Sequence, residues 1–248
     1  MSEFTKIAGD YDKGRKGEAI EFWADEVTRL AHLDWNSQIL DLGCGTGLYT
    51  RGMGVETSAT LCGLDPSLGM LERAREKSTE VHWFCAVGEG LPLRSGVFDC
   101  VFSSQVWHHI VDRQGTADEC GRVLGERGTV VIRTISHDQL RRKVVFDFFP
   151  EIMENQLRVY PSNDDFTRFF RVAGFASTEF LAYDLERYQG VDELIEVAEK
   201  KLWSMFRPIT HEGLEKGVER LRQHERESPG EPVRNDETIT LVVARKTL

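Results

Sequence analysis

The sequence lacks a long apolar segment, and none of its stretches reaches the length that a membrane-spanning helix requires. The first fifteen residues alternate charged, polar and small side chains, so they also lack the apolar centre of a secretory signal peptide. These two absences argue against an exported or membrane-embedded protein. We therefore expect a cytoplasmic protein that does not enter a membrane.

Cysteine is scarce, with five residues in 248 and no C-x-x-C pair. Four of the five lie in apolar or glycine-rich stretches, which predicts free thiols packed in the interior rather than a disulfide framework. No group of His, Cys, Asp and Glu has the spacing of a metal site. The sequence therefore predicts no metal.

Basic residues are outnumbered, since 31 Lys and Arg stand against 41 Asp and Glu and give a net charge of −10. Proteins that bind nucleic acids use Lys and Arg to neutralise phosphates, so this balance disfavours RNA or DNA as a partner. Arg141-Arg142-Lys143 is the one compact basic run, and we interpret it as a solvated helix face.

The chain has no internal repeat and no Pro/Gly linker, which predicts one domain over residues 1–248. Apolar runs that predict strands occupy residues 38–42, 60–64, 81–86, 98–103, 128–134, 178–184 and 238–244. Helical spacing occupies residues 17–32, 68–77, 118–124 and 164–173. Continuous apolar strands are typical of a parallel sheet covered on both faces. We expect an α/β protein whose seven-stranded, mostly parallel sheet is flanked by helices.

The predicted core comprises residues 17–136, 163–186 and 237–248, with insertions at 1–16, 137–162 and 187–236. The last insertion has helical patterns at 191–205 and 212–225, and we interpret it as a helical cap. A structural support or a subunit contact is the alternative. The many phenylalanines of the insertions are expected to be mainly core residues.

A glycine loop, Asp41-Leu-Gly-Cys-Gly-Thr-Gly47, joins the first predicted strand to a helix. Its third glycine falls one position too early for the dinucleotide pattern G-x-G-x-x-G, and no Lys follows as a phosphate-binding P-loop requires. Asp65 ends the next predicted strand, where an acid in this topology binds a ribose diol. The pair indicates a ligand that contains adenosine.

The segment Ile39–Gly47 resembles motif I of class I methyltransferases that use S-adenosylmethionine (SAM), and in particular small-molecule methyltransferases of the UbiE type. Segments 63–71, 89–92, 98–101 and 119–128 resemble the later motifs of that family. The resemblance implies a Rossmann-like class I methyltransferase fold, SAM as the cofactor and methyl transfer as the reaction.

The resemblance also implies a set of SAM-binding residues: Asp41, Gly43, Gly45, Gly47, Asp65, Pro66, Met70, Val87, Gly88, Glu89, Ser103, Ser104, Tyr11 and Arg15. The loop glycines and Asp41 would surround the methionine part, and Asp65 would hold the ribose. Val87 stands where the family commonly has an Asp that binds the adenine amine. Its backbone, with that of the two residues after it, would then read the base.

Within the set, Pro66 and Met70 would pack near the adenine. Ser103 and Ser104 would contact the amino group or the carboxylate of the methionine part. Tyr11 would lie near the methyl group and Arg15 near the carboxylate.

Methyl transfer is an in-line displacement that needs a base only when the acceptor must first lose a proton. His108 and His109 follow the fourth predicted strand and are candidate general bases, since histidine titrates near neutrality. The alternative is that they only shape the pocket wall.

We expect a small-molecule acceptor. Methylation of a protein or tRNA, and SAM binding without methyl transfer, are the alternatives. The sequence specifies neither the acceptor nor an oligomeric state.

Overall fold

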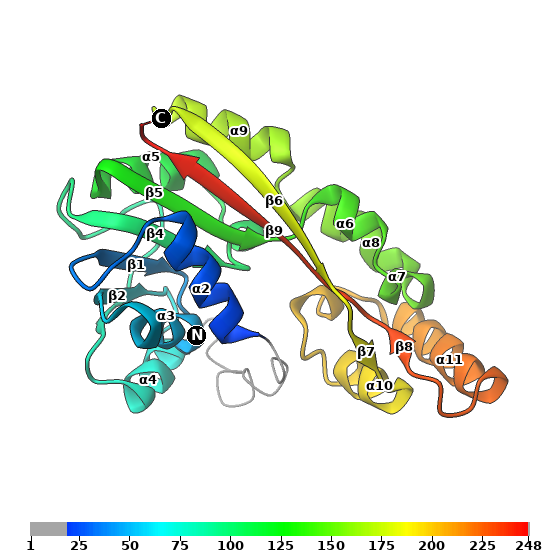
Figure 1. Ribbon diagram of the computed structural model, residues 1–248. Helices are drawn as coiled ribbons and strands as arrows, with labels where there is room; N and C mark the ends of the chain where they lie inside the picture. The colour runs from blue at the N-terminus through cyan, green and yellow to red at the C-terminus, as the bar shows by residue number, and fades with distance from the viewer. Residues whose placement is uncertain (1–18, 248) are drawn as a thin grey trace. The chain divides into compact units, whose positions relative to one another are not determined.

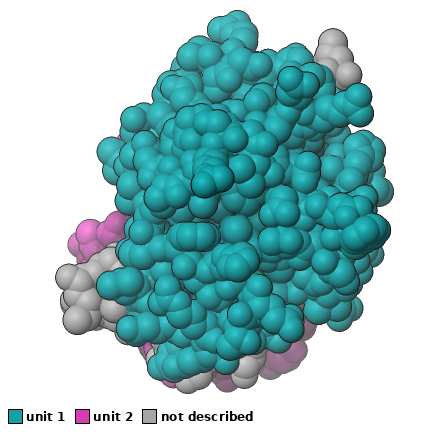
Figure 2. All heavy atoms as spheres, turned by 90° about the vertical axis from the view of Figure 1, so that its left-hand side faces the viewer, with its two compact units in different colours: residues 1–134, 163–181, 240–248 teal, residues 135–162, 182–239 magenta. Residues whose placement is uncertain are grey.

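The computed structural model describes residues 19–247 of the chain. The chain divides into two compact units, which Figure 2 distinguishes by colour. Unit 1 comprises residues 1–134, 163–181 and 240–248, and unit 2 comprises residues 135–162 and 182–239. The expected organisation as one domain with insertions stays a prediction.

The main sheet has seven strands in the order β3-β2-β1-β4-β5-β9-β6 (Figure 1). The strands are β1 Gln38–Leu42, β2 Thr60–Leu64, β3 His82–Phe84, β4 Phe98–Ser104, β5 Leu124–Thr134, β6 Ser177–Leu185 and β9 Glu237–Arg245. The pairs among β1 to β5 are parallel, whereas β9 runs antiparallel to β5. The prediction of a seven-stranded, mostly parallel sheet is therefore confirmed.

Helices of unit 1 pack on this sheet and are α2 Ile20–Leu30, α3 Leu48–Thr57, α4 Leu68–Lys77, α5 Arg113–Val123 and α9 Asn163–Val172. The expected helix over 118–124 is wrong in its start, because α5 begins five residues earlier. Asp112 caps it by accepting a hydrogen bond of 2.8 Å from the Gly115 amide. That cap satisfies a free amide of the first turn, so the helix can begin there.

Unit 2 is mainly helical, with α6 His137–Arg141, α7 Val145–Phe148, α8 Pro150–Val159, α10 Val191–Glu199 and α11 His211–Glu227. A 3-10 turn, η3 Ser204–Phe206, and a two-stranded sheet of β7 Tyr188–Gln189 and β8 Val233–Arg234 complete it. The helix expected over 191–205 begins at Val191 as predicted but is wrong in its end, because α10 stops at Glu199. Lys201 has a φ of +50°, and this left-handed backbone ends the helical run.

Five phenylalanines in and beside the insertions are buried core residues, as expected. Phe146, Phe149 and Phe206 are buried in the core of unit 2, with aliphatic side chains of α10 and α11. Phe166 and Phe170 of α9 are buried in the core of unit 1. These rings therefore stabilise the fold and give no information about an acceptor.

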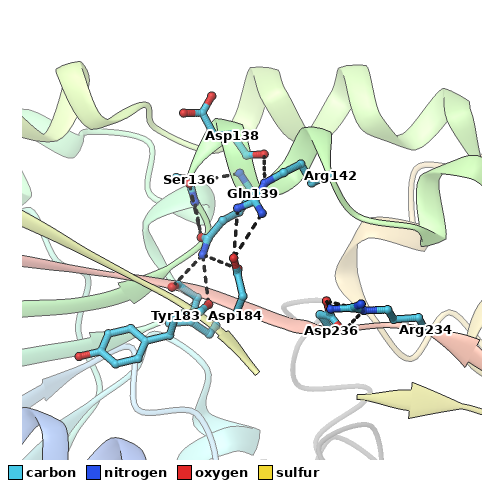
Figure 3. A network of polar contacts seen from close by, with 9 residues as sticks. Ser136, Asp138, Gln139, Arg142, Tyr183, Asp184, Arg234 and Asp236 are labelled. Carbon is cyan, nitrogen blue, oxygen red and sulfur yellow. Dashed lines mark hydrogen bonds and ion pairs between the residues drawn. The ribbon is translucent and has the colours of Figure 1, made fainter. Parts of the chain in front are cut away.

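A polar network built on Gln139 connects three segments of unit 2 (Figure 3). Gln139 forms a capping box with Ser136 at the start of α6. Its buried amide nitrogen also donates to the Tyr183 carbonyl at 3.2 Å, the Ile239 carbonyl at 3.0 Å and the Asp184 carboxylate at 3.2 Å. One side chain thereby satisfies acceptors that the chain brings from distant positions.

The basic run at 141–143 is matched by acidic groups of the same unit. Arg141 pairs with Asp138 at 3.2 Å. Arg142 pairs with Asp184 at 3.3 Å (Figure 3). Burial lowers the pKa of Lys143, although nearby carboxylates act in the opposite direction. The prediction of a solvated helix face is therefore wrong for Lys143, which is half-buried and lies beyond the end of α6, and the run is not an isolated positive patch.

All five cysteines are free thiols; Cys85 is exposed and the other four are buried, as expected. None of the helices within residues 19–247 combines the length and the apolar character that crossing a bilayer demands.

Gly217 tests the packing of unit 2, because a Cβ atom added there would overlap the Phe149 ring. Alanine favours a helix over glycine, yet overpacking of this kind costs about 1–3 kcal/mol. We expect Gly217→Ala to lower the melting temperature by about 2–10 °C in a thermal unfolding scan. Gly190→Ala is the matched control, since that position has open space, and an unchanged melting temperature for both variants would contradict the packing described.

Candidate functional site

The glycine loop leaves β1 in a tight turn and enters α3. Gly43, Gly45 and Gly47 have φ angles of +76°, +54° and +75°, a region that side chains rarely adopt. The amides of Gly43 and Cys44 donate to the Leu64 carbonyl at 2.7 and 3.0 Å, which ties the loop to the end of β2. The loop conformation thus requires glycine at each of the three positions.

Protein side chains occupy the space that two of these glycines leave open. A Cβ atom on Gly43 would overlap Val106, and one on Gly47 would lie 2.6 Å from the Trp83 ring. The same ring lies against Gly63 of β2. Close approach of the protein to itself therefore explains these glycines, besides any approach of a ligand.

Asp65 follows β2 and holds the glycine loop through its carboxylate. One oxygen accepts from the Gly45 amide at 3.0 Å, and the other accepts from the Ser67 amide at 2.8 Å. Burial raises the pKa of Asp65, whereas these two hydrogen bonds lower it. A carboxylate has about four lone-pair sites, so both oxygens retain acceptor capacity for ligand hydroxyls.

Asp41 is the penultimate residue of β1, two residues before Gly43, and is 2% exposed. Burial raises its pKa to about 7, the hydrogen bond from Thr50 acts against this rise, and the charge of Asp65 adds to it. The Thr50 hydroxyl donates to the Asp41 carboxyl group at 2.5 Å. A carboxyl group that titrates near neutrality therefore lies beneath the loop.

The segment after β3 lies against the start of α4. The Asp65 amide donates to the Phe84 carbonyl at 3.2 Å, and the Cys85 thiol donates to the Pro66 carbonyl at 3.7 Å. Leu68 and Val87, which belong to these two adjoining segments, are 58% and 47% exposed. Two apolar side chains are thus accessible near Asp65.

The other residues predicted for the adenine side differ in exposure. Met70 of α4 is buried, Glu89 is exposed, and the position of a Cβ on Gly88 would be 2.9 Å from Thr116. Gly88 therefore lies close to the start of α5, and only the backbone fits there.

The segment after β4 carries the predicted histidines. Ser103 is fully buried at the end of the strand, and Ser104 is half-buried. Gln105 adopts a left-handed φ of +56°, which is uncommon for a residue with a side chain. His108 and His109 lie in the 3-10 turn η2 Trp107–His109 with ring centroids 3.9 Å apart. His109 is exposed and His108 half-buried.

The predicted residues within 19–247 lie at the ends of β1 and β4 or in the segments that follow β1, β2, β3 and β4. Those strands are parallel neighbours, so the segments lie at one edge of the sheet, the carboxyl edge where open α/β sheets bind ligands. Tyr11 and Arg15 lie outside the described residues.

The donor set suits an adenosyl ligand: a carboxylate with acceptor capacity for a diol, accessible apolar side chains for a base, and an acid beneath the loop. Among residues 19–247, no three His, Cys, Asp or Glu side chains gather as a possible metal site.

Sequence reasoning missed three residues of this edge. Thr50 bonds Asp41, Trp83 fills the space beside Gly47, and Arg133 of β5 is 2% exposed. Only Arg133 had a signal in the sequence, since it is a lone charge within the apolar run Val130-Val-Ile-Arg-Thr134. The other two depend on contacts between distant segments.

Comparison with known sequences gives similarity to methyltransferases. The model of a family described as "Methyltransferase domain" matches residues 40–132. The ubiquinone/menaquinone biosynthesis C-methyltransferase UbiE of Campylobacter jejuni is 32% identical, over 52% of this chain and 60% of that protein. The malonyl-[acyl-carrier protein] O-methyltransferase of Legionella pneumophila is 31% identical, over 56% of this chain and 50% of that protein. The chain thus spans only 50–60% of these two relatives.

A longer match is the demethylmenaquinone methyltransferase of Lactococcus lactis, 30% identical over 71% of this chain and 82% of that protein. Among solved structures, a putative methyltransferase from an antibiotic biosynthesis pathway of Anabaena variabilis has a TM-score of 0.77 at 20% identity. The structural match covers 90% of this chain and 96% of the Anabaena variabilis chain. At this identity the structural likeness supports the fold alone.

Asp41 should make the stability of the protein depend on pH. Its pKa rises from 3.8 to about 7 on folding, so the folded state binds more protons between these pH values than the unfolded state. The free energy of unfolding should therefore fall as pH rises through this range, by at most about 1.4 kcal/mol per pH unit. Asp41→Asn should remove that pH-dependent component, because an amide does not titrate. The amide oxygen can still accept the hydrogen bond from Thr50.

Urea titrations of both proteins at pH 5, 6, 7 and 8 measure the difference. An identical pH dependence for the variant and the unsubstituted protein would show that Asp41 is ionised throughout this range.

Proposed function

The chain belongs to the class I SAM-dependent methyltransferase family, and on this premise we propose that it transfers a methyl group from SAM to a small-molecule acceptor. The observation that carries the proposal is the pair of Asp65 and the glycine loop. The Asp65 carboxylate lies 3.0 Å from the Gly45 amide, at the edge where a cofactor in this fold would bind.

In this proposal the ribose, the adenine and the methionine part of SAM contact different residues at the carboxyl edge of the sheet. Asp65 accepts hydrogen bonds from the ribose diol, and the accessible Leu68 and Val87 contact the adenine with Pro66 nearby. Backbone groups at Val87, Gly88 and Glu89 read the polar edge of the base, since Val87 has no side-chain acceptor.

The methionine part lies along the glycine loop towards Ser103 and Ser104. Met70, being buried, supports the adenine region from below. The roles proposed for Tyr11 and Arg15 remain those that the family resemblance implies.

SAM supplies an electrophilic methyl group on a sulfonium when it is bound. The protein's contribution is to hold the acceptor in line with that methyl group, which can supply much of the rate by itself. The Asp41 carboxyl group, placed beneath the loop, loses its proton more readily when a cation lies close. It would therefore favour the cationic sulfonium over the neutral thioether of the product, S-adenosylhomocysteine (SAH).

The acceptor is proposed to be a small molecule because the names of the relatives describe quinone C-methylation and O-methylation of a carrier-bound malonyl group. These names differ in the atom that is methylated, so the proposal extends to the class of acceptor only. The net charge of −10 argues against tRNA, and a cytoplasmic location is part of the proposal.

Calorimetric titration of the full chain with SAM, SAH and NAD tests the cofactor. We expect micromolar binding of SAM and SAH and none of NAD. Asp65→Asn should weaken SAM and SAH binding by roughly 10- to 100-fold, because it removes charge-assisted hydrogen bonds to the ribose. Asparagine is preferable to alanine, since one oxygen can still hold the loop.

Asp99→Asn is the matched control, because Asp99 also accepts a backbone hydrogen bond, from Gln38 at 2.8 Å, but at the opposite end of β1. Unchanged SAM affinity in Asp65→Asn would show that the cofactor does not bind at Asp65. Binding of SAM without turnover on any acceptor of a broad panel would favour a SAM-binding protein without methyl transfer.

His108→Ala and His109→Ala test for a general base once a panel has identified an acceptor. Loss of a base lowers turnover by about 100- to 10,000-fold, so we expect one of the two variants to lose this much kcat. SAM affinity should stay the same, and the acidic limb of the pH profile should disappear. Full turnover in both variants would mean that positioning alone supplies the rate.

A further inference from the structure

A buried positive charge lies at the carboxyl edge of the sheet, outside the residues assigned above. Arg133 is the penultimate residue of β5 and is 2% exposed, and its chain neighbours Ile132 and Thr134 are buried as well. Burying a guanidinium is costly unless its surroundings compensate the charge.

Among residues 19–247, the Arg133 side chain contacts elements α2, α3 and β4. The central carbon of its guanidinium lies 4.9 Å from the ring centroid of Trp23 in α2 and 5.1 Å from that of Tyr49 in α3. Cation–π contacts of this kind attract and orient the guanidinium. One terminal nitrogen also donates to the Ser104 hydroxyl at 3.4 Å. The group is thus fixed in one orientation.

The position of Arg133 connects the two halves of the candidate site. Tyr49, which touches its guanidinium, lies two residues after Gly47 of the glycine loop. Ser104 pairs with Arg133 across the sheet, and the Gln105 amide donates to the Arg133 carbonyl at 2.8 Å. The guanidinium therefore lies between the start of α3 and the segment that leads to the histidines.

A fixed guanidinium is well suited to a carboxylate, because its planar N–H groups match the two oxygens in paired hydrogen bonds. Asp41 and Asp65 at the same edge are acids, so a carboxylate bound there gains from a cation of this kind. A hydroxyl such as that of Ser104 can donate a further hydrogen bond to the same anion.

We propose that Arg133 and Ser104 form a carboxylate-binding subsite at the active edge. The subsite deepens the proposed function and rests on it for its location. A carboxylate there has two sources, the amino-acid part of the cofactor and an acidic acceptor. Both present the same chemistry to the guanidinium, and binding experiments distinguish them.

Calorimetry on the full chain uses SAH and its decarboxylated analogue, adenosylthiopropylamine, which keeps the amine but lacks the carboxylate. A second titration adds malonate or benzoate to protein saturated with SAH. The variants are Arg133→Met, which keeps the length of the side chain without its charge, Arg133→Lys, which keeps the charge without the planar fork, and Ser104→Ala.

Arg127→Met is the matched control, because Arg127 lies on the same strand with an exposed side chain. It removes the same charge from the chain and should leave every titration unchanged. Melting temperatures establish that each variant is folded, and if Arg133→Met does not fold, Arg133→Lys and Ser104→Ala carry the test.

If the subsite holds the cofactor carboxylate, Arg133→Met lowers the affinity for SAH at least 30-fold. Its affinity for the decarboxylated analogue stays within twofold of that of the unsubstituted protein. If it holds the acceptor carboxylate, SAH affinity is unchanged, and the binding of malonate or benzoate seen in the unsubstituted protein is lost in Arg133→Met. The affinities of Arg133→Lys and Ser104→Ala should lie between those of the unsubstituted protein and those of Arg133→Met.

The proposal is overturned if folded variants bind SAH as the unsubstituted protein does and no carboxylate binds in an Arg133-dependent way. The failure of the proposed function looks different. In that case the unsubstituted protein binds neither SAH nor its analogue, while malonate and benzoate titrations of the free protein still report on Arg133.

Discussion

The candidate site depends on the hydrogen bonds of one carboxylate, that of Asp65. Parallel pairing of β1 with β2 brings the ends of both strands to the same edge, but it does not fix the loops that follow them. Asp65 does so by accepting from the Gly45 amide on one side and the Ser67 amide on the other. The glycine loop, the end of β2 and the start of α4 are thereby held as one unit.

The shape of this edge is set before any ligand arrives. Val106 and Trp83 occupy the space beside Gly43 and Gly47, so the loop rests on side chains of distant segments. Backbone amides held in this way need little rearrangement to meet a ligand, which reduces the entropy lost on binding. Packing and binding therefore demand glycine at the same positions for two separate reasons.

Prediction from sequence succeeded where one physical signal was strong. Strands such as β1 and β2 are short and mainly apolar, and their bounds, 38–42 and 60–64, were predicted correctly. Helices α6 and α7 were missed because they are too short for a helical period to emerge. The role of Thr50 and the confinement of Arg133 depend on which segments meet in space, and no local pattern reports that.

A buried acid with a pKa of about 7 is also a store of exchangeable protons. With a pKa of about 7, Asp41 is present in both protonated and ionised forms near neutral pH, and the Thr50 hydroxyl donates to its carboxyl group. A cation arriving above it would release that proton to the solvent, so the heat of ligand binding would include the ionisation heat of the buffer. Loading this edge with a cationic ligand is therefore a proton-release event as much as a binding event.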